Sequence, residues 1–365
     1  MSATSKFSGT DLAHMRAALT LAARGLGRVW PNPAVGCVLV SPDHRVVARG
    51  WTQKGGRPHA ETEALRRAGA AAKRATAYVS LEPCSHHGKT PPCVDAIVKA
   101  GVSRVVIAAR DPNPVAAGGA DRLRAAGIAI DIGVQEHEAR EINAAFFNST
   151  GSDRPWVTLK LALSLDGAIT GAGRTGGWLT GEQSRDEVQR LRAASDAIAV
   201  GIQTALVDNP RLTARTDPPP RIAPMRIVFD RSARLPVESV LAKTAREIPT
   251  LLVTSRAARL STALADAGVE QLTAVDVGDA LHKLKARGIV SLLVEGGAGL
   301  AASFLAGGFV DRLVIFRAPI ILGEGALGAF SGIASQEVQH APRLTLIETR
   351  ALGDDVMSVY SVRKG

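Results

Sequence analysis

Short apolar segments alternate with helical segments along nearly the whole chain, and this alternation constrains the fold more than any other feature. In residues 1–150 the predicted strands are 35–41, 45–51, 75–84, 104–109 and 128–133, and the predicted helices are 10–24, 59–69, 91–101, 119–127 and 136–147. Thr10 and Gly25 are expected to bound the first helix. Strands and helices in this order predict an α/β/α layered domain.

A second alternating series follows a polar segment, NSTGSDRP at 148–155, which has the composition of a linker. A chain of 365 residues is also too long for one ordinary core, so we expect two domains, 1–150 and 151–365. Thr180 is expected to cap a helix in the second domain. The predicted strands of this domain are 156–164, 196–201, 226–230, 250–255, 290–297, 311–322 and 354–362, and its predicted helices are 180–195 and 298–308.

The charge and cysteine content of the chain narrow its partners and its compartment. The net charge is +10 and aromatic residues make up only 4% of the chain. Scattered cations without interleaved aromatics favour small phosphorylated ligands over nucleic acid. Three cysteines without a secretory signal are typical of a reducing compartment, and no apolar run reaches the roughly 18 residues that span a membrane. We therefore expect a cytoplasmic protein that binds neither membrane nor nucleic acid.

One histidine and two cysteines of the first half have the number and type of ligands found in catalytic zinc sites. His59 opens a predicted helix, Cys84 follows a strand, and Cys93 follows Pro92 at a helix start that favours a thiolate. Such a site has three protein ligands and an open fourth position for water. Glu61 could reach that position without ligating and transfer a proton. The order H-x-E and then P-C is that of zinc deaminases, although eight residues instead of two separate the cysteines.

Other interpretations of these residues stay open. A histidine and a glutamate two positions apart often occur together by chance, and loop cysteines of intracellular proteins are often inert. His86 or His87, between the two cysteines, could complete a four-ligand structural site. Cys37 lies inside an apolar strand and is expected to be a buried hydrophobic residue.

The segment LLVEGGAGLAASFL at 292–305 predicts a strand, a glycine-rich turn and a helix start. Gly297, Gly299 and Ala302 fit the G-x-G-x-x-G/A pattern, in which a helix N-terminus approaches a phosphate. The pattern is weak by itself, and no strand with an acidic residue follows about 20 positions later. An arginine-bearing pocket without that acid would favour NADP over NAD.

Four segments of the first half resemble a known family. They are PNPAVGCVLV (31–40), PHAETEAL (58–65), YVSLEPCSHHGKTPPCVDAI (78–97) and ARDPNP (109–114), and they resemble the deaminase half of the bifunctional riboflavin-biosynthesis deaminase–reductases. The resemblance implies a cytidine deaminase-like fold over residues 10–148. It implies that His59, Cys84 and Cys93 bind Zn²⁺ and that Glu61 transfers protons. It also implies that Asn32 binds the substrate pyrimidine, although a turn residue between two prolines is an equally good explanation.

The second half resembles the reductase half of the same family over about 156–360, with a fold like that of dihydrofolate reductase. LKLALSLDGAIT (159–170), DNPRLTAR (208–215) and VEGG (294–297) carry this resemblance. It implies an NADPH site formed by Ala162, Trp178, Thr204, Asp208, Arg231, Gly297, Ala298, Gly299, Leu300, Ala301, Ala302 and Ser303. It implies substrate contacts from Lys160, Arg192, Leu212, Arg215 and Glu295. The arginines are suited to bidentate contact with a phosphate, and Lys160 and Asp208 are candidate acids at the reacting sugar.

Two positions depart from the pattern of this family. Gly176 stands where many relatives carry a substrate-contacting serine, so backbone or water would replace that contact. Arg231 stands where a serine follows the strand in many relatives.

We therefore expect a bifunctional riboflavin-biosynthesis enzyme with Zn²⁺ and NADPH as cofactors and a phosphorylated pyrimidine as substrate. Family resemblance implies a homo-oligomer. One alternative is a nucleic-acid or nucleoside deaminase with an appended binding domain, and another is a non-catalytic scaffold with structural zinc.

Overall fold

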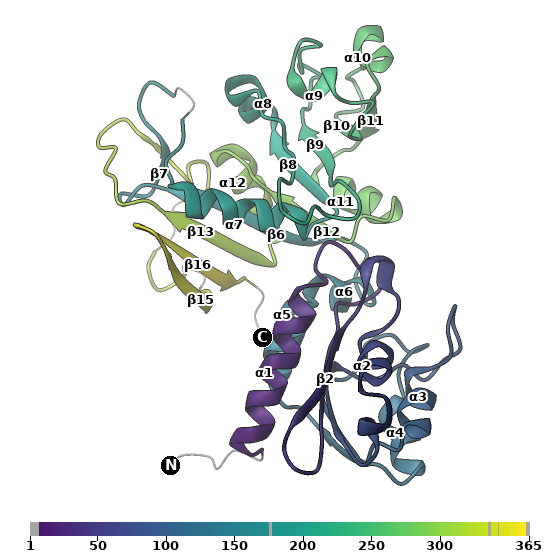
Figure 1. The fold of residues 1–365 in the computed structure, drawn as a ribbon. Coiled ribbons are helices and arrows are strands. Elements are labelled where there is room, and N and C mark those ends of the chain that lie inside the picture. Colours follow the sequence, from purple (N-terminus) through teal and green to yellow (C-terminus); the bar gives the residue numbers. More distant parts are fainter. Residues whose placement is uncertain (1–6, 175–176, 335–336, 342, 363–365) are drawn as a thin grey trace. The chain divides into compact units, whose positions relative to one another are not determined.

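The computed structural model describes residues 7–174, 177–334, 337–341 and 343–362. The chain forms two compact units, Met1–Gly151 and Ser152–Gly365 (Figure 1). Each unit is built on its own β-sheet and has its own apolar core residues.

The first unit contains a five-stranded mixed sheet with the order β2-β1-β3-β4-β5. β1 pairs antiparallel with β2 and β3, whereas β3, β4 and β5 run parallel. The strands are β1 (Gly36–Val40), β2 (Val46–Trp51), β3 (Thr76–Leu81), β4 (Arg104–Ala109) and β5 (Ala129–Ile132). The helices are α1 (Gly9–Ala23), α2 (Ala60–Ala68), α3 (Cys93–Lys99), α4 (Gly119–Ala125), α5 (Glu136–Ile142) and α6 (Ala144–Ser149), with 3-10 turns η1 (Lys54–Gly56) and η2 (Gly69–Ala72).

Helices cover both faces of this sheet, which confirms the predicted three-layer arrangement. α1 and α5 lie on one face, and α2, α3 and α4 lie on the other (Figure 1). All five residues of β1 are buried, as expected for a strand covered on both faces. Gly36 allows α1 to lie close to β1, because a Cβ atom at this position would lie 1.9 Å from the carbonyl oxygen of Ala18.

Two local predictions for this unit are wrong. Ser8, not Thr10, caps α1: its Oγ accepts a hydrogen bond from the N–H of Asp11 at 3.0 Å, and the Asp11 carboxylate accepts one from the N–H of Ser8. The predicted helix 136–147 is divided into α5 and α6 at Asn143, whose backbone leaves the helical region. The Asn143 side chain instead hydrogen-bonds the backbone of Ala34.

The second unit contains a nine-stranded sheet with the order β11-β10-β9-β8-β12-β6-β13-β16-β15. Neighbours from β11 to β13 in this order are parallel, and β16 and β15 are added antiparallel. The strands are β6 (Trp156–Leu163), β8 (Ala197–Gly201), β9 (Met225–Phe229), β10 (Thr250–Thr254), β11 (Val269–Thr273), β12 (Ser291–Val294), β13 (Arg312–Arg317), β15 (Thr345–Leu352) and β16 (Asp355–Ser361). β7 (Ala168–Thr170) and β14 (Leu327–Gly328) form a separate small ladder.

The helices of this unit pack on the sheet through three apolar clusters. They are α7 (Glu182–Ala193), α8 (Ile202–Asp208), α9 (Val240–Lys243), α10 (Thr262–Asp266), α11 (Val277–Ala286) and α12 (Ala298–Ala306). α11 and α12 share one cluster with β6 and β12, α8 to α10 share another with β8 to β10, and α7 packs with β13 and β16. Because alternate residues of β6 are buried, Lys160 and Ala162 lie on the opposite face from Leu159 and Leu161.

Two predictions for this unit are also wrong. The N-cap of α7 is Gly181, not Thr180, and a carboxylate from β16 satisfies the start of the helix. Oδ2 of Asp355 accepts hydrogen bonds from the N–H of Gly181 at 2.8 Å and from Oγ of Ser184 at 2.6 Å. The predicted strand 311–322 ends at Arg317. Among the helices of the described residues, none is long and apolar enough to cross a membrane.

Candidate functional site

The structure brings His59, Cys84 and Cys93 together in the first unit. His59 precedes α2, Cys84 lies in the loop after β3, and Cys93 is the first residue of α3. Nδ1 of His59 lies 3.6 Å from Sγ of Cys84 and 3.3 Å from Sγ of Cys93. Tetrahedral ligands at ordinary Zn–N and Zn–S bond lengths lie about 3.5 Å apart. The spacing and the donor set of one imidazole and two sulfurs therefore fit zinc with an open fourth position.

The two sulfur atoms lie so close together that ionisation of Cys84 opposes ionisation of Cys93. Hydrogen bonds from the Cys93 thiol and from the Cys93 N–H, the latter at 3.3 Å, lower the pKa of Cys84 to about 4. The same interaction with Cys84 raises the pKa of the Cys93 thiol. A metal ion between the sulfurs would make both of them thiolates.

Glu61 is the buried acid of this site. It lies in the first turn of α2 and is 4% exposed. Burial raises its pKa to about 7, although His59 opposes the shift. A carboxyl group with a pKa near the working pH can both accept and donate a proton.

His59, Glu61 and Cys84 line a cavity of about 190 Å³ together with Asn32. Nδ2 of Asn32 lies 3.2 Å from Nε2 of His59 and donates to the carbonyl of Gly56 at 3.2 Å. His86 also lines the cavity, but neither His86 nor His87 belongs to the described group of potential metal ligands. Cys37 is 1% exposed, as predicted for a buried hydrophobic residue.

Several lining residues of this cavity were not predicted: Thr52, Arg57, Glu82, Asp111, Asn113 and Phe146. Asp111 and Asn113 lie in the segment ARDPNP directly after β4, and this strand-end position is a signal that could have identified them. Glu82 follows β3, and its carboxylate accepts hydrogen bonds from the N–H groups of Ala120 and Asp111. It thereby fixes the loops around Cys84.

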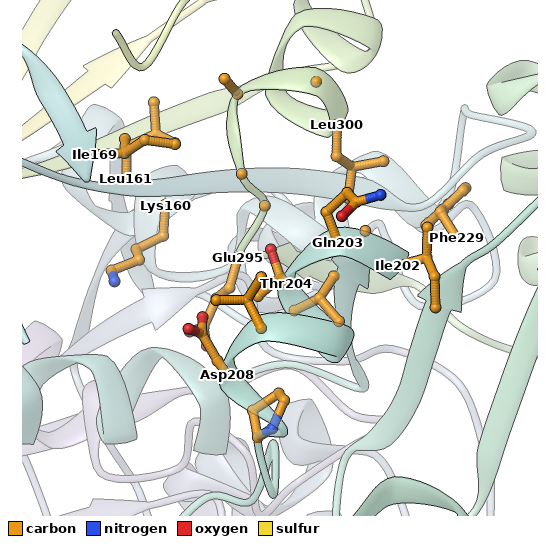
Figure 2. A pocket seen from close by; sticks show the side chains of 18 of the residues that line it. Lys160, Leu161, Ile169, Ile202, Gln203, Thr204, Asp208, Phe229, Glu295 and Leu300 are labelled. Carbon is orange, nitrogen blue, oxygen red and sulfur yellow. The ribbon is translucent and has the colours of Figure 1, made fainter. Parts of the chain in front are cut away.

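A larger cavity, of about 1720 Å³, lies in the second unit (Figure 2). Residues that follow the carboxyl ends of β8, β9 and β12 line it, together with residues of β6, α7 and α8. Open parallel sheets bind ligands at this edge. The volume exceeds the range of about 300–1,000 Å³ that is usual for one small ligand, so it can hold an extended dinucleotide together with a second molecule.

A largely buried ion pair joins α7 to the end of β12 in this cavity. Nε and Nη2 of Arg192 lie 2.6 and 2.8 Å from the two carboxylate oxygens of Glu295, and Nη1 donates to the carbonyl of Thr213 at 3.1 Å. Burial alone would raise the pKa of Glu295, but Arg192 reverses the shift and the net change is downward. Burial lowers the pKa of nearby Lys160. The bidentate face of Arg192 is thus engaged by Glu295, which differs from the expected contact with a phosphate.

Most of the residues predicted for the second site line this cavity: Lys160, Ala162, Trp178, Arg192, Thr204, Asp208, Leu212, Arg215, Arg231, Glu295, Gly297, Ala298, Gly299, Leu300 and Ser303. Ala301 and Ala302 are not among the described lining residues; both are buried on α12, and Ala301 packs in the apolar core. Gly176 lies outside the described residues. Lining residues that were not predicted include Arg174, Arg185, Gln203, Arg211, Arg234 and Thr254. Gln203 lies two positions after the end of β8, in the first turn of α8, and this position near a strand end was an available signal.

The glycine-rich turn and the start of α8 lie beside each other in the cavity wall, since a Cβ atom on Gly297 would lie 3.5 Å from Oγ1 of Thr204. Gly297 is the N-cap of α12, whose first N–H groups are suited to a phosphate. Figure 2 shows Leu300 beside Gln203 of α8, Thr204 and Asp208 further along this part of the wall, and Lys160 of β6 on the side of Glu295. Desolvation raises the pKa of Asp208. Trp178 is 75% exposed, and the Arg185 guanidinium lies 5.4 Å from its ring centre.

Both halves of the chain match known protein families. Residues 8–109 match the cytidine and deoxycytidylate deaminase zinc-binding region, and residues 155–358 match the RibD C-terminal domain. The folds and sites therefore define a bifunctional enzyme, a zinc-dependent deaminase followed by an NADPH-dependent reductase.

Relatives match along almost the whole length of the chain. Riboflavin biosynthesis protein RibD of Aquifex aeolicus is 41% identical over 353 residues, which cover 96% of this chain and 98% of the relative. The Escherichia coli K12 protein of the same name is 39% identical over 374 residues, covering 95% and 98%. The chain belongs to the RibD family of riboflavin biosynthesis proteins.

Solved structures agree with this assignment. Form 1 of Acinetobacter baumannii RibD is 37% identical with a TM-score of 0.83, covering 97% of this chain and 99% of that one. A Thermotoga maritima diaminohydroxyphosphoribosylaminopyrimidine deaminase/5-amino-6-(5-phosphoribosylamino)uracil reductase is 34% identical with a TM-score of 0.85 and the same coverage. The predicted family, fold class, pair of activities and cofactors are confirmed.

Proposed function

We propose that the first unit removes an amine hydrolytically from a phosphoribosylated diaminopyrimidinone and that the second reduces the ribosyl group of the product to ribityl. The observation that carries the first assignment is the His59–Cys84–Cys93 group, of which His59 and Cys84 line one cavity together with buried Glu61. The name of the Thermotoga relative supports this substrate pair. Three potential ligands, instead of four, favour catalytic over structural zinc.

His59, Cys84 and Cys93 would hold the zinc ion, which activates water by lowering its pKa. Glu61 accepts a proton from water and delivers it to the departing amine, so that water replaces the amine and ammonia leaves. The buried position of Glu61 gives it the raised pKa that this exchange requires. Asn32 orients the pyrimidine, because its amide can donate and accept hydrogen bonds.

In the second unit, NADPH supplies the hydride when it is bound. The start of α12 at Gly297 and the residues of α8 hold its phosphates and ribose. Glu295, which is fixed by Arg192, and Lys160 would serve as charged partners for a sugar hydroxyl and a developing alkoxide; their shared position in the cavity supports these roles. Of the two arginines expected to contact the substrate, Arg215 is the one available to its phosphate, since Arg192 is engaged by Glu295.

One experiment tests both assignments in the full-length protein. The Glu61→Ala variant receives the diaminopyrimidinone, or separately the deaminated intermediate, together with NADPH. We expect ammonia release to fall about 10²–10⁴-fold, which is the range for loss of a general acid–base group. Oxidation of NADPH with the supplied intermediate should stay at the parent rate. Ammonia release at the parent rate would contradict the assigned role of Glu61.

We also propose that the protein is a cytoplasmic homo-oligomer. Its three cysteines are free, which fits a reducing compartment. Strand β15 is exposed at the edge of its sheet and offers unpaired backbone groups. Light scattering of the purified protein would test the oligomer, and a monomeric mass would contradict it.

A further inference from the structure

We propose that Asn143 is a positioning residue of the deaminase site, which holds the segment 31–35 and thereby sets the position of Asn32. The proposal rests on the role assigned to Asn32 above. It concerns a side chain more than 100 positions away in the sequence, at the break between α5 and α6.

The segment 31–35 forms part of the wall of the deaminase cavity. Pro31, Asn32, Pro33 and Val35 line this cavity. The segment lies between α1 and β1 and belongs to no helix or strand. Ala34 and Val35 of this segment are buried, so their backbone N–H and C=O groups need partners from outside the segment.

Asn143 supplies two of these partners. Its Oδ1 accepts a hydrogen bond from the N–H of Ala34 at 2.8 Å, and its Nδ2 donates to the carbonyl of Ala34 at 2.8 Å. Asn143 is 5% exposed and Ala34 is 2% exposed. The side chain thus gives Ala34 the two bonds that a neighbouring β-strand would give, because a carboxamide carries a donor and an acceptor side by side.

A second side chain holds the flanking residues in the same way. Oγ1 of Thr52 accepts from the N–H of Val35 at 3.0 Å and donates to the carbonyl of Pro33 at 3.2 Å. Thr52 itself lines the cavity, but Asn143 is not among the described lining residues. Among the described contacts, Asn143 is therefore linked to the cavity wall through the segment 31–35 and not by lining it directly.

The break in the helix is what makes this contact possible. The backbone of Asn143 has φ −105° and ψ 24°, outside the helical region, and α6 begins again at Ala144. Phe146, in the first turn of α6, reaches the cavity wall. At this break Asn143 bonds Ala34 while Phe146 lines the cavity, so we infer that the break serves the substrate site.

The test uses full-length Asn143→Leu, which has a similar size but lacks the amide. We expect the deaminase KM to rise about tenfold, which corresponds to about 1.4 kcal/mol. We expect kcat within about twofold of the parent value, one zinc ion per chain, and unchanged reductase activity on the deaminated intermediate. The amide of Ala34 should exchange its hydrogen about tenfold faster or more, because it has lost its acceptor.

A stability-matched control separates positioning from general weakening. Tyr78→Phe removes another buried hydrogen bond of the same unit, from the Tyr78 hydroxyl to Asp11 at 2.9 Å, and leaves the segment 31–35 untouched. It should leave the deaminase KM unchanged. If Asn143→Leu does not fold, Asn143→Asp carries the test, since it keeps the acceptor for Ala34 and should raise KM less than tenfold.

An unchanged KM in the Asn143 variants would overturn the proposal, and so would an equal rise of KM in Tyr78→Phe. If the Asn143 variants lose zinc and their kcat falls as well, the effect is a structural one, and this result would also overturn the proposal. The variant Asn32→Ala separates the substrate-binding role of Asn32 from the positioning role of Asn143. If Asn32→Ala raises KM and Asn143→Leu does not, only the positioning role fails; if neither raises it, the proposed role of Asn32 fails first.

Discussion

The ion pair of Arg192 and Glu295 permits a quantitative test of how the reductase cavity is held together. The two side chains are 10% and 11% exposed and form two short hydrogen bonds, at 2.6 and 2.8 Å. We consider the single variants Arg192→Met and Glu295→Leu, and the double variant that replaces both groups with apolar side chains.

The expected magnitudes follow from burial. Removing one partner of a buried pair leaves an uncompensated charge and costs about 3–5 kcal/mol. The two charge-assisted hydrogen bonds, at about 1.5–3 kcal/mol each, together give about 3–6 kcal/mol, which overlaps that range. Glu295→Leu should lower the free energy of unfolding more than Arg192→Met does, because it leaves the Arg192 and Lys160 cations without a negative partner. When Arg192 is absent instead, Lys160 still compensates the charge of Glu295. The double variant should lose only about 1–2 kcal/mol, so the coupling energy should exceed about 3 kcal/mol.

The assay is hydrogen exchange of the β12 amides across a urea series, which reports the second unit within the full-length chain. The control is the cycle on Arg287 and Glu270, a pair at 2.7 Å in the same unit whose side chains are 37% and 55% exposed. Its coupling should be below about 1 kcal/mol. Additive losses at Arg192 and Glu295, or equal coupling in the two cycles, would refute the reasoning from burial.

Three further predictions follow from the described contacts. His59→Ala and Cys93→Ala should each lose zinc in metal analysis of the purified protein, whereas Cys37→Ala should retain it, since Cys37 is outside the metal-binding group; retained zinc in the first two would contradict the ligand set. Gly36→Ala should lower the free energy of unfolding of the first unit by about 1–3 kcal/mol, because its Cβ atom would lie 1.9 Å from the carbonyl oxygen of Ala18. Gly9→Ala should leave it unchanged, since nothing lies within 4 Å of a Cβ atom there. Equal melting temperatures of the two variants would contradict this. Arg192 lowers the pKa of Glu295, so the pairing should contribute full stability above the ordinary value of 4.5 and lose it as the pH falls through the lower folded-state pKa. Urea unfolding of the second unit at several pH values should show this slope in the parent protein, and an identical slope in Glu295→Gln would contradict it.

The deaminase site could be predicted from the sequence because each member stands at a local signal. His59 and Cys93 open helices, Cys84 follows a strand, and the spacing between Glu61 and His59 is fixed by one helical turn. The long insert between the cysteines does not alter this arrangement, since both ends of the insert are anchored to β3 and α3. Residue type, order and element boundary together were sufficient.

Contacts between distant segments could not be predicted in this way. Asn143 reads as an ordinary helical position in EHEAREINAAFF, and its role depends on Ala34, which is 109 positions away. Asp355 reads as part of a strand, yet it satisfies the start of α7 in place of Thr180. Most residues of strand β15 are exposed, so buried and exposed positions do not alternate along it. It therefore lacks the apolar periodicity by which a strand is recognised in a sequence.

Part of the net positive charge of the chain lies in the wall of the reductase cavity. Among the described residues that line the reductase cavity, eight are Lys or Arg and four are Asp or Glu, a local excess of +4 within a chain total of +10. Arg192 is engaged by Glu295, and Arg234 lies 3.8 Å from the buried Asp230, so the excess is carried by the remaining cations. A cavity that must hold the phosphates of NADPH and of its substrate needs such an excess. Sequence composition could relate the positive charge only to phosphorylated ligands in general. The structure places part of this charge in the cavity where two such ligands, NADPH and the substrate, would meet.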